Sequence, residues 1–228
     1  MGAALVLVGW ILQAMALDRG SVTVIEPIFS MTVVFVLPLG WWLTAQTVTL
    51  KHALRACVVV LGLMLFITFG NPAGGRANAP NWEWLVAIVL VALLCGGLMW
   101  AGREDQPTVR AGTYGAVSGL LAGLLCGTLT KPTVELLHSG GLAAVLGSWM
   151  VYALALAGLL AVLYQQVALQ TGRLAPSVAT GSVANPLIGV ILGIVLLEQF
   201  LSPPTWHKVV ALSALGCALA AAAAIALS

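Results

Sequence analysis

The stretch VAIVLVALLCGGLM at residues 86–99 decides the fold, because it is apolar throughout and carries no charged side chain. A second stretch of this kind, LIGVILGIVLL, occupies residues 187–197. Both lie in longer apolar blocks of about 17 to 25 residues, the length at which a helix rising 1.5 Å per residue crosses a hydrocarbon core of about 30 Å. The blocks therefore predict membrane-spanning α-helices.

The overall composition agrees with a membrane protein. Hydrophobic residues make up 61% of the 228-residue chain and charged residues 7%, whereas an ordinary soluble domain has about 25% charged residues. The formal net charge of +2 is spread over isolated residues, without the basic cluster that neutralises phosphates. We expect the lipid bilayer, and no nucleic acid, as a partner.

Eight apolar blocks predict an all-α integral membrane protein with about eight transmembrane helices. They cover residues 1–17, 21–43, 53–70, 83–101, 112–130, 146–169, 174–197 and 207–227. The joints between them are rich in glycine, proline and charged residues, including HSGG at residues 138–141 between the fifth and sixth spans. No joint is long enough for a soluble domain.

The basic residues at the joints predict the orientation, because cytoplasmic loops carry an excess of Lys and Arg. The first, third and seventh joints hold Arg19, Arg76 and Lys208. The second, fourth and sixth joints hold a larger set: Lys51, Arg55, Arg103, Arg110 and Arg173. The second set is expected in the cytoplasm, which puts both termini there, in a bacterial plasma membrane.

An internal repeat organises the chain. QAMALDRG at residues 13–20 matches QQVALQTG at residues 165–172, and each copy leads into a span in which a proline follows a polar residue, Glu26-Pro27 and Asn185-Pro186. The copies are five spans apart, an odd number, so they must cross the membrane in opposite directions. Inverted repeats of this kind are typical of secondary transporters.

The repeat divides the chain into three parts. Residues 1–70 form a first repeat of three helices, residues 71–110 a linking helix with its loops, and residues 111–228 a second repeat of four helices. The span at 112–130 has no counterpart before residue 1. We therefore expect the first repeat to be truncated at its N-terminus.

Three segments carry a family resemblance: LQAMAL at residues 12–17, VIEPI at 24–28 and VANPLIGVILG at 183–193. They resemble the drug/metabolite transporter superfamily (EamA-like), and within it most closely bacterial relatives of the NIPA magnesium transporters. That family usually has four helices, a linking helix and four more, so the resemblance implies a missing first helix. It also implies transport without naming the cargo.

The chain departs from the family pattern at two places. The family usually has Gln-Pro in the first copy and Glu-Pro in the second, whereas this chain has Glu26-Pro27 and Asn185-Pro186. The family usually has Gly-Glu after the second proline-broken helix, where this chain reads Leu197-Glu198-Gln199. The carboxylate has changed halves, so the family's site residues cannot simply be transferred.

Glu26 is the first candidate for a substrate-binding residue, because a charge inside a membrane span is costly and is usually functional. Pro27 lacks an N–H and breaks the helix by leaving the carbonyl of Thr23 without its donor. Carboxylate and carbonyl together could bind a cation or a proton. The alternative is that Glu26 lies near the outer headgroups and caps the helix or pairs with Arg19.

Asn185 is the matching candidate in the second repeat. It lies at mid-span on one i, i+4 ridge with Gly181, Gly189 and Gly193, so it is expected to face neighbouring helices. Pro186 breaks this helix and frees a second carbonyl. An unwound turn at the midplane is the usual form of a transporter site, and the alternative is a kinked packing helix with an interhelical Asn bond.

Further polar residues complete the predicted binding set. Gln13 and its repeat partner Gln165 are neutral amides expected to flank one cavity, with Gln166 and Tyr164 as secondary candidates. Lys131, at the end of the fifth span, either extends its ammonium group to the interface or, if buried, favours an anionic or zwitterionic solute.

A glycine stripe marks the fifth span. Gly115, Gly119, Gly123 and Gly127 follow each other at i, i+4 spacing, which lets helix backbones approach closely. The stripe predicts helix packing or sliding and does not predict ligand binding.

These features predict a carrier of a small solute or cation that works by alternating access. Two alternatives stay open: a magnesium or other divalent-cation transporter, and a non-transporting membrane subunit or truncated paralogue, with a homodimer or a membrane complex as the assembly. We expect no enzyme, cofactor or metal site, because the sequence has no nucleophile paired with a base, no HExxH motif and no phosphate-binding loop.

Overall fold

The structure is a computed structural model, and it describes residues 2–29, 50–70, 75–76, 78–103, 106–171, 174–199 and 205–226. All regular secondary structure in these residues is helical, which confirms the all-α fold for this part of the chain. The helices are α1 (Gly2–Arg19), α2 (Val22–Phe29), α4 (Leu50–Gly70), α5 (Asn81–Ala101), α6 (Pro107–Ala122), the π-helix η1 (Gly123–Leu129), α7 (Thr130–Leu146), α8 (Trp149–Gln170), α9 (Leu174–Val195) and α10 (Thr205–Ala226).

Six of the eight predicted spans have a helix with similar bounds, and two differ. The span at 21–43 begins with α2, but residues 30–49 lie outside the described residues. The fifth span, expected at 112–130, continues through η1 into α7. The joint predicted at residues 138–141 is present as a kink at Gly141, with φ 68° and ψ −169°, where two helical segments of α7 meet.

Two helices among the described residues, α5 and α8, are long and apolar enough to cross a membrane. They support membrane association. In α9 and α10 the apolar stretches are shorter, Thr180–Val195 and Thr205–Ala221. The count of eight spans therefore stays a prediction.

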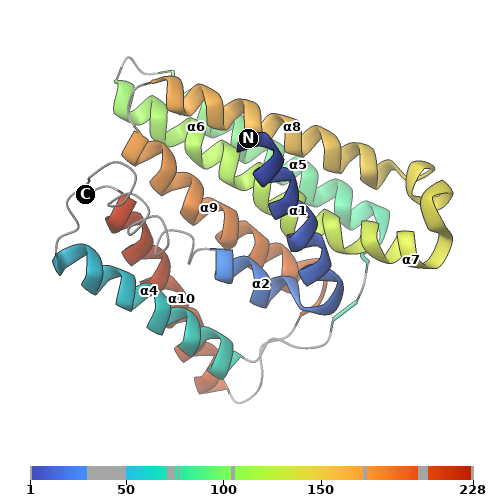
Figure 1. The fold of residues 1–228 in the computed structure, drawn as a ribbon, viewed down its shortest axis with the longest axis horizontal. Coiled ribbons are helices and arrows are strands. Elements are labelled where there is room, and N and C mark those ends of the chain that lie inside the picture. The colour runs from blue at the N-terminus through green and yellow to red at the C-terminus, as the bar shows by residue number, and fades with distance from the viewer. Residues whose placement is uncertain are drawn as a thin grey trace.

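Helix α9 lies at the centre of the bundle, between the layer of α6 and α8 and the pair formed by α4 and α10 (Figure 1). It contributes to both hydrophobic clusters of the described residues. One cluster joins it through Leu192 to buried residues of α1, α2 and α5, such as Leu17 and Trp84. The other joins it through Val190 to α4 and α10, where Phe66 is fully buried. The central position of α9 follows from this double burial.

A row of close contacts joins α6 to α9. A Cβ added at Gly119 would lie 2.5 Å from the carbonyl oxygen of Gly181, and one added at Gly115 or Gly123 would collide with the carbonyl of Ser177 or Asn185. We call these three contacts the glycine seam. Small residues at four-residue spacing let the two backbones touch.

Hydrogen bonds between helices reinforce the glycine seam. The Thr180 hydroxyl of α9 donates to the carbonyl of Gly112 in α6 at 2.7 Å. On another face of α6, the Ser118 hydroxyl donates to the carbonyl of Ala161 in α8 at 2.8 Å. Such bonds link helices without requiring apolar burial, so they tie α6 to α9 on one side and to α8 on the other.

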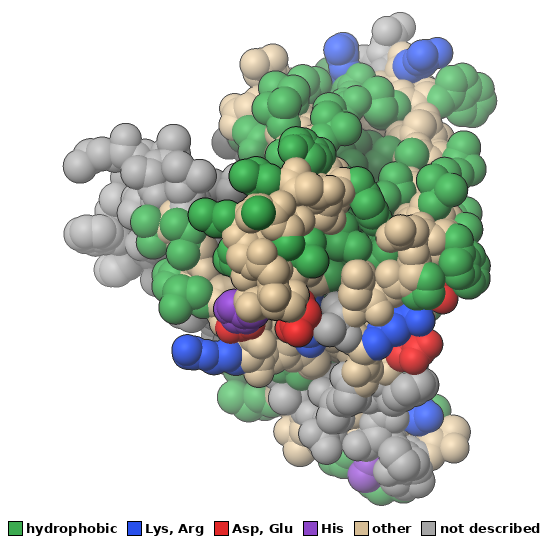
Figure 2. Space-filling model, turned by 90° about the vertical axis from the view of Figure 1, so that its right-hand side faces the viewer, with side chains coloured by type: hydrophobic (Ala, Val, Ile, Leu, Met, Phe, Trp, Pro, Cys, Tyr) green, Lys and Arg blue, Asp and Glu red, His purple; other side chains and the backbone are tan. Residues whose placement is uncertain are grey.

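Charged side chains gather at the ends of the helices. The acidic side chains that the structure describes, Asp18, Glu83, Glu135 and Glu198, lie near the end of the bundle where α1 ends and α5 begins. Arg103 and Arg110 lie at the opposite end, where α5 ends and α6 begins. Figure 2 shows basic side chains at the top, a mixed band of both signs lower down, and a broad apolar face between them. This distribution agrees with a bilayer around the middle of the bundle.

The glycine seam makes a stability prediction. Gly119→Ala forces a methyl group against the carbonyl of Gly181, and overpacking of this kind costs about 1–3 kcal/mol. We expect a lower midpoint of thermal unfolding in detergent. Gly97→Ala on α5 is the matched control, because a Cβ there meets nothing within 4 Å, so its midpoint should stay unchanged or rise with the better helix propensity of alanine. Equal midpoints for both variants would contradict the seam.

Candidate functional site

The candidate site lies where the two proline-containing helices, α2 and α9, meet the π-helix η1. Helix α2 packs against α9, and η1 contacts α1 and α2 as well as α6, α8 and α9. Elements from both predicted repeats therefore converge on η1. In a transporter built from repeats, the substrate site lies at such a convergence.

The local sequence explains why the helix widens at η1. Gly123 and Gly127 lower the helix propensity of the segment. Pro132, just beyond it, has no N–H to donate to the carbonyl of Thr128. The Thr128 hydroxyl donates to the carbonyl of Leu124, at 2.7 Å within η1, which gives that carbonyl a side-chain partner. Short π-helices of this kind occur frequently at functional sites.

Asn185 faces η1 from α9. A Cβ on Gly123 would lie 3.2 Å from Asn185 Oδ1, and that oxygen is buried without a hydrogen-bond partner among the described residues. Buried Pro186 follows it, and its missing N–H leaves the carbonyl of Ser182 without an intrahelical donor. The break in α9 thus holds a buried acceptor without a partner among the described residues, Asn185 Oδ1, and an unsatisfied buried acceptor needs an explanation such as a ligand.

A second polar contact joins the halves directly. Gln199, just after α9, is fully buried, and its Oε1 accepts from the Thr23 amide at 2.9 Å and from the Thr23 hydroxyl at 2.6 Å. Its Nε2 is buried with no partner among the described residues. Gly193 makes room, since a Cβ there would lie 2.9 Å from Thr23 Oγ1. The side chain of Gln199 therefore places its Nε2 donor and its Oε1 acceptor between the start of α2 and the residues that follow α9.

The structure brings some predicted site residues together and leaves others apart. Gln165 is half-buried on α8, and its Oε1 lies near Gly181, an α9 residue of the glycine seam. Gln13 is buried on α1, which packs against η1 and α7. Gln166 is exposed. Tyr164 stacks on Tyr114 of α6, with ring centroids 6.1 Å apart.

Several other predicted site residues have side chains that the structure does not describe. Glu26 and Pro27 lie in α2, but their side chains are outside the described residues. Gly127 lies in η1, and its surroundings are likewise outside the description. Gly189 is buried on α9.

Lys131 connects α7 to the turn between α1 and α2. It is half-buried, and its Nζ donates to the carbonyl of Gly20 at 3.2 Å. His138 and Asp18 lie 3.4 Å apart at the same junction. Lys131 therefore links α7 to the part of the chain predicted to be the first repeat.

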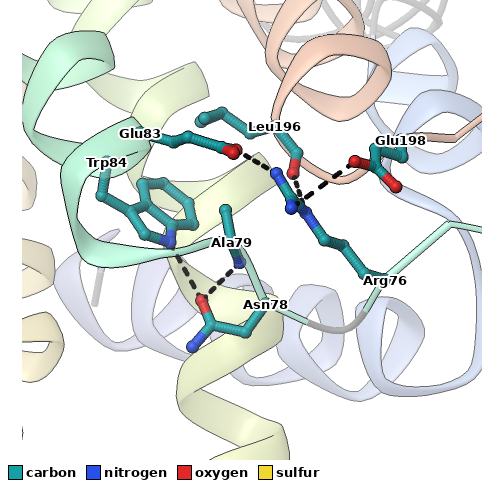
Figure 3. A network of polar contacts seen from close by, with 7 residues as sticks. All are labelled: Arg76, Asn78, Ala79, Glu83, Trp84, Leu196 and Glu198. Carbon is teal, nitrogen blue, oxygen red and sulfur yellow. Dashed lines mark hydrogen bonds and ion pairs between the residues drawn. The ribbon is translucent and has the colours of Figure 1, made fainter.

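Arg76 organises a second polar network at one end of α5 and α9 (Figure 3). Its guanidinium contacts the Glu83 carboxylate, lies 3.5 Å from that of Glu198, and donates through Nε to the carbonyl of Leu196 at 2.8 Å. A cavity of about 500 Å³ adjoins the network. None of the predicted site residues with described side chains lines it.

Sequence reasoning missed several residues of these two networks. It treated Arg76 only as an orienting charge, and Glu198-Gln199 only as a departure from a family pattern. It considered the backbone carbonyl of Thr23 and did not consider its side chain. A signal for Gln199 was present, since two polar residues, Glu198 and Gln199, follow the apolar stretch that ends at Leu197.

Comparison with known proteins gives one relative. No family model matches the chain, and no solved structure matches it. An uncharacterized protein of Corynebacterium glutamicum is 24% identical over 218 residues, which cover 96% of this chain and 74% of that protein. The similarity spans nearly the whole chain and names no activity.

The contact between Thr23 and Gln199 is open to a direct test. Gln199→Leu keeps the volume but leaves both Thr23 donors unpaired, and each buried unsatisfied group costs about 1–3 kcal/mol. We expect a clear loss of stability in detergent unfolding. Adding Thr23→Val should restore part of it, because the hydroxyl donor is then gone. Gln170→Leu, at an exposed position on α8, is the control with little expected effect, and independent losses at residues 23 and 199 would contradict the contact.

Proposed function

We propose that the chain is a multi-pass membrane transporter of the drug/metabolite transporter type, which moves a small solute or cation by alternating access. One observation carries the proposal: Asn185 Oδ1, a buried acceptor without a partner in the part of the chain that the structure describes, lies at a proline break in the central helix. Polar groups inside membrane helices are costly, and they often mark solute pathways.

The depth of Asn185 supports this role. Helix α9 runs over Leu174–Val195, so Asn185 lies 185 − 174 = 11 residues from one end and 195 − 185 = 10 from the other. It is therefore at the middle of the helix. Transporter sites lie near the bilayer midplane, at helices whose hydrogen bonding is interrupted.

The arrangement of equivalent helices supports two inverted repeats. Helices α1 and α8, which carry the matching segments, run in opposite directions (Figure 1). Their successors α2 and α9, each with an internal proline, pack against each other. A pseudo-two-fold axis between inverted repeats produces such contacts between equivalent helices.

The polar groups fit a small solute better than a divalent metal ion. The break in α9 offers the neutral oxygen acceptor of Asn185, which has no partner among the described residues, and no described carboxylate beside it. Ca²⁺ takes 6–8 oxygen ligands, and Mg²⁺ is usually held by one or two carboxylates with water. Within the part of the chain that the structure describes, no group of three or more His, Cys, Asp or Glu residues could hold a metal. A solute or monovalent cation is therefore the favoured cargo.

Uptake into proteoliposomes tests the proposal. We would measure it for a panel of amino acids, monovalent cations and magnesium, with and without a pH gradient. Asn185→Leu should lower saturable uptake about tenfold, the effect of losing about 1.4 kcal/mol of binding. Glu26→Gln should abolish any dependence on the pH gradient. Ser213→Ala is the control, because this exposed α10 hydroxyl bonds only within its own helix.

Two outcomes would count against transport through this site. Saturable uptake that is the same for Asn185→Leu and wild type would remove Asn185 from the pathway. Absence of uptake for every solute by folded protein would favour the non-transporting membrane subunit. Uptake of magnesium alone would favour the divalent-cation carrier.

A further inference from the structure

The cavity beside Arg76 is a groove that follows one face of α5. Its α5 lining includes Glu83, Val86, Leu90 and Leu94, at the three- and four-residue spacing of a single helix face. From residue 83 to 94 this face runs for about 16 Å at 1.5 Å per residue. The opposite wall is α9, where Ile188, Ile191, Leu192 and Val195 line the groove.

The lining changes character along the groove. Its length is apolar, and the apolar side chains are open to the surroundings, with Leu90 61% and Val195 65% exposed. Its charged residues, Arg76, Glu83 and Glu198, are confined to one end, together with the exposed indole of Trp82. Tryptophan is enriched at the level of lipid headgroups. The groove therefore has the polarity of an amphiphile, charged at one end and apolar along its length.

The charged end has an excess of negative charge. Two carboxylates share one guanidinium, and Arg76 uses Nη2 for Glu83 and Nε for the Leu196 carbonyl (Figure 3). Glu198 lies 3.5 Å from Nη1 and its side chain is 52% exposed. One carboxylate is thus open to a cationic partner, and charge-assisted hydrogen bonds to it are the strong ones.

The backbone holds Glu198 at this position. Its φ is +50°, in the left-handed region that non-glycine residues adopt at a cost of about 1–3 kcal/mol. The residues on both sides are hydrogen-bonded: Arg76 N donates to the carbonyl of Leu197 at 2.8 Å, and Gln199 N to that of Gly193 at 3.1 Å. The surrounding structure fixes the carboxylate at the mouth of the groove.

We propose that this groove binds a membrane phospholipid with an ammonium headgroup, one acyl chain lying between α5 and α9 and the ammonium group on Glu198. The charge pattern favours this lipid over a helix from a second copy, because the exposed carboxylate of Glu198 lies at one end of an otherwise apolar lining. The proposal does not depend on transport.

Native mass spectrometry tests the site on the full chain. Detergent-purified protein is equilibrated with phosphatidylethanolamine or with phosphatidylglycerol of the same acyl chains, and retained lipid is counted. Wild type should retain phosphatidylethanolamine preferentially. Leu90→Trp fills the groove and should lose this retention. Leu93→Trp is the matched control, because Leu93 is similarly exposed on α5, at 67%, and lies outside the groove.

Glu198→Gln separates headgroup binding from chain binding. The variant should still bind lipid, but its preference for phosphatidylethanolamine should fall about tenfold, which corresponds to one charge-assisted hydrogen bond. Size-exclusion profiles show whether each variant folds. The proposal is overturned if Leu90→Trp and Leu93→Trp retain lipid equally, or if wild type holds both lipids equally. A wild-type dimer that only Leu90→Trp converts to monomer would also overturn it, since a second copy would then cover the groove.

Discussion

Where Gly119 of α6 meets Gly181 of α9, two helix backbones touch with no side chain between them. This contact fixes the position of α9, and α9 in turn carries residues of both hydrophobic clusters. It also fixes the face that α9 presents, because Asn185 lies one turn beyond Gly181 on the same ridge. The close approach therefore also brings Asn185 against Gly123 of the π-helix.

Much of the fold could be predicted from the sequence, because its signals are local. Apolar blocks locate most of the helices, since a helix in an apolar environment must satisfy its own backbone. The stripe beginning at Gly115 and the ridge at Gly181 could also be recognised, each from spacing alone. That these two faces pack against each other could not, because spacing identifies a face and gives no information about its partner.

The candidate site was less predictable, for two physical reasons. Thr23 and Gln199 are 176 positions apart, and no local pattern links an amide to a threonine in the other half of the chain. The π-helix depends on a competition between two glycines and a later proline, and propensities do not resolve such a balance. The break at Asn185-Pro186, by contrast, was visible in the sequence because proline acts on its own helix.

The run from α6 through η1 to α7 belongs to both halves of the molecule. Its first part is held to α9 by the glycine seam, and its last part is tied to the turn after α1, where Lys131 contacts Gly20. The change of partner occurs within η1. The run is therefore held at both ends by different helices, and η1 is the segment between the two attachments. A rotation of the helices packed on α7 relative to those packed on α6 would twist η1, which lies beside Asn185.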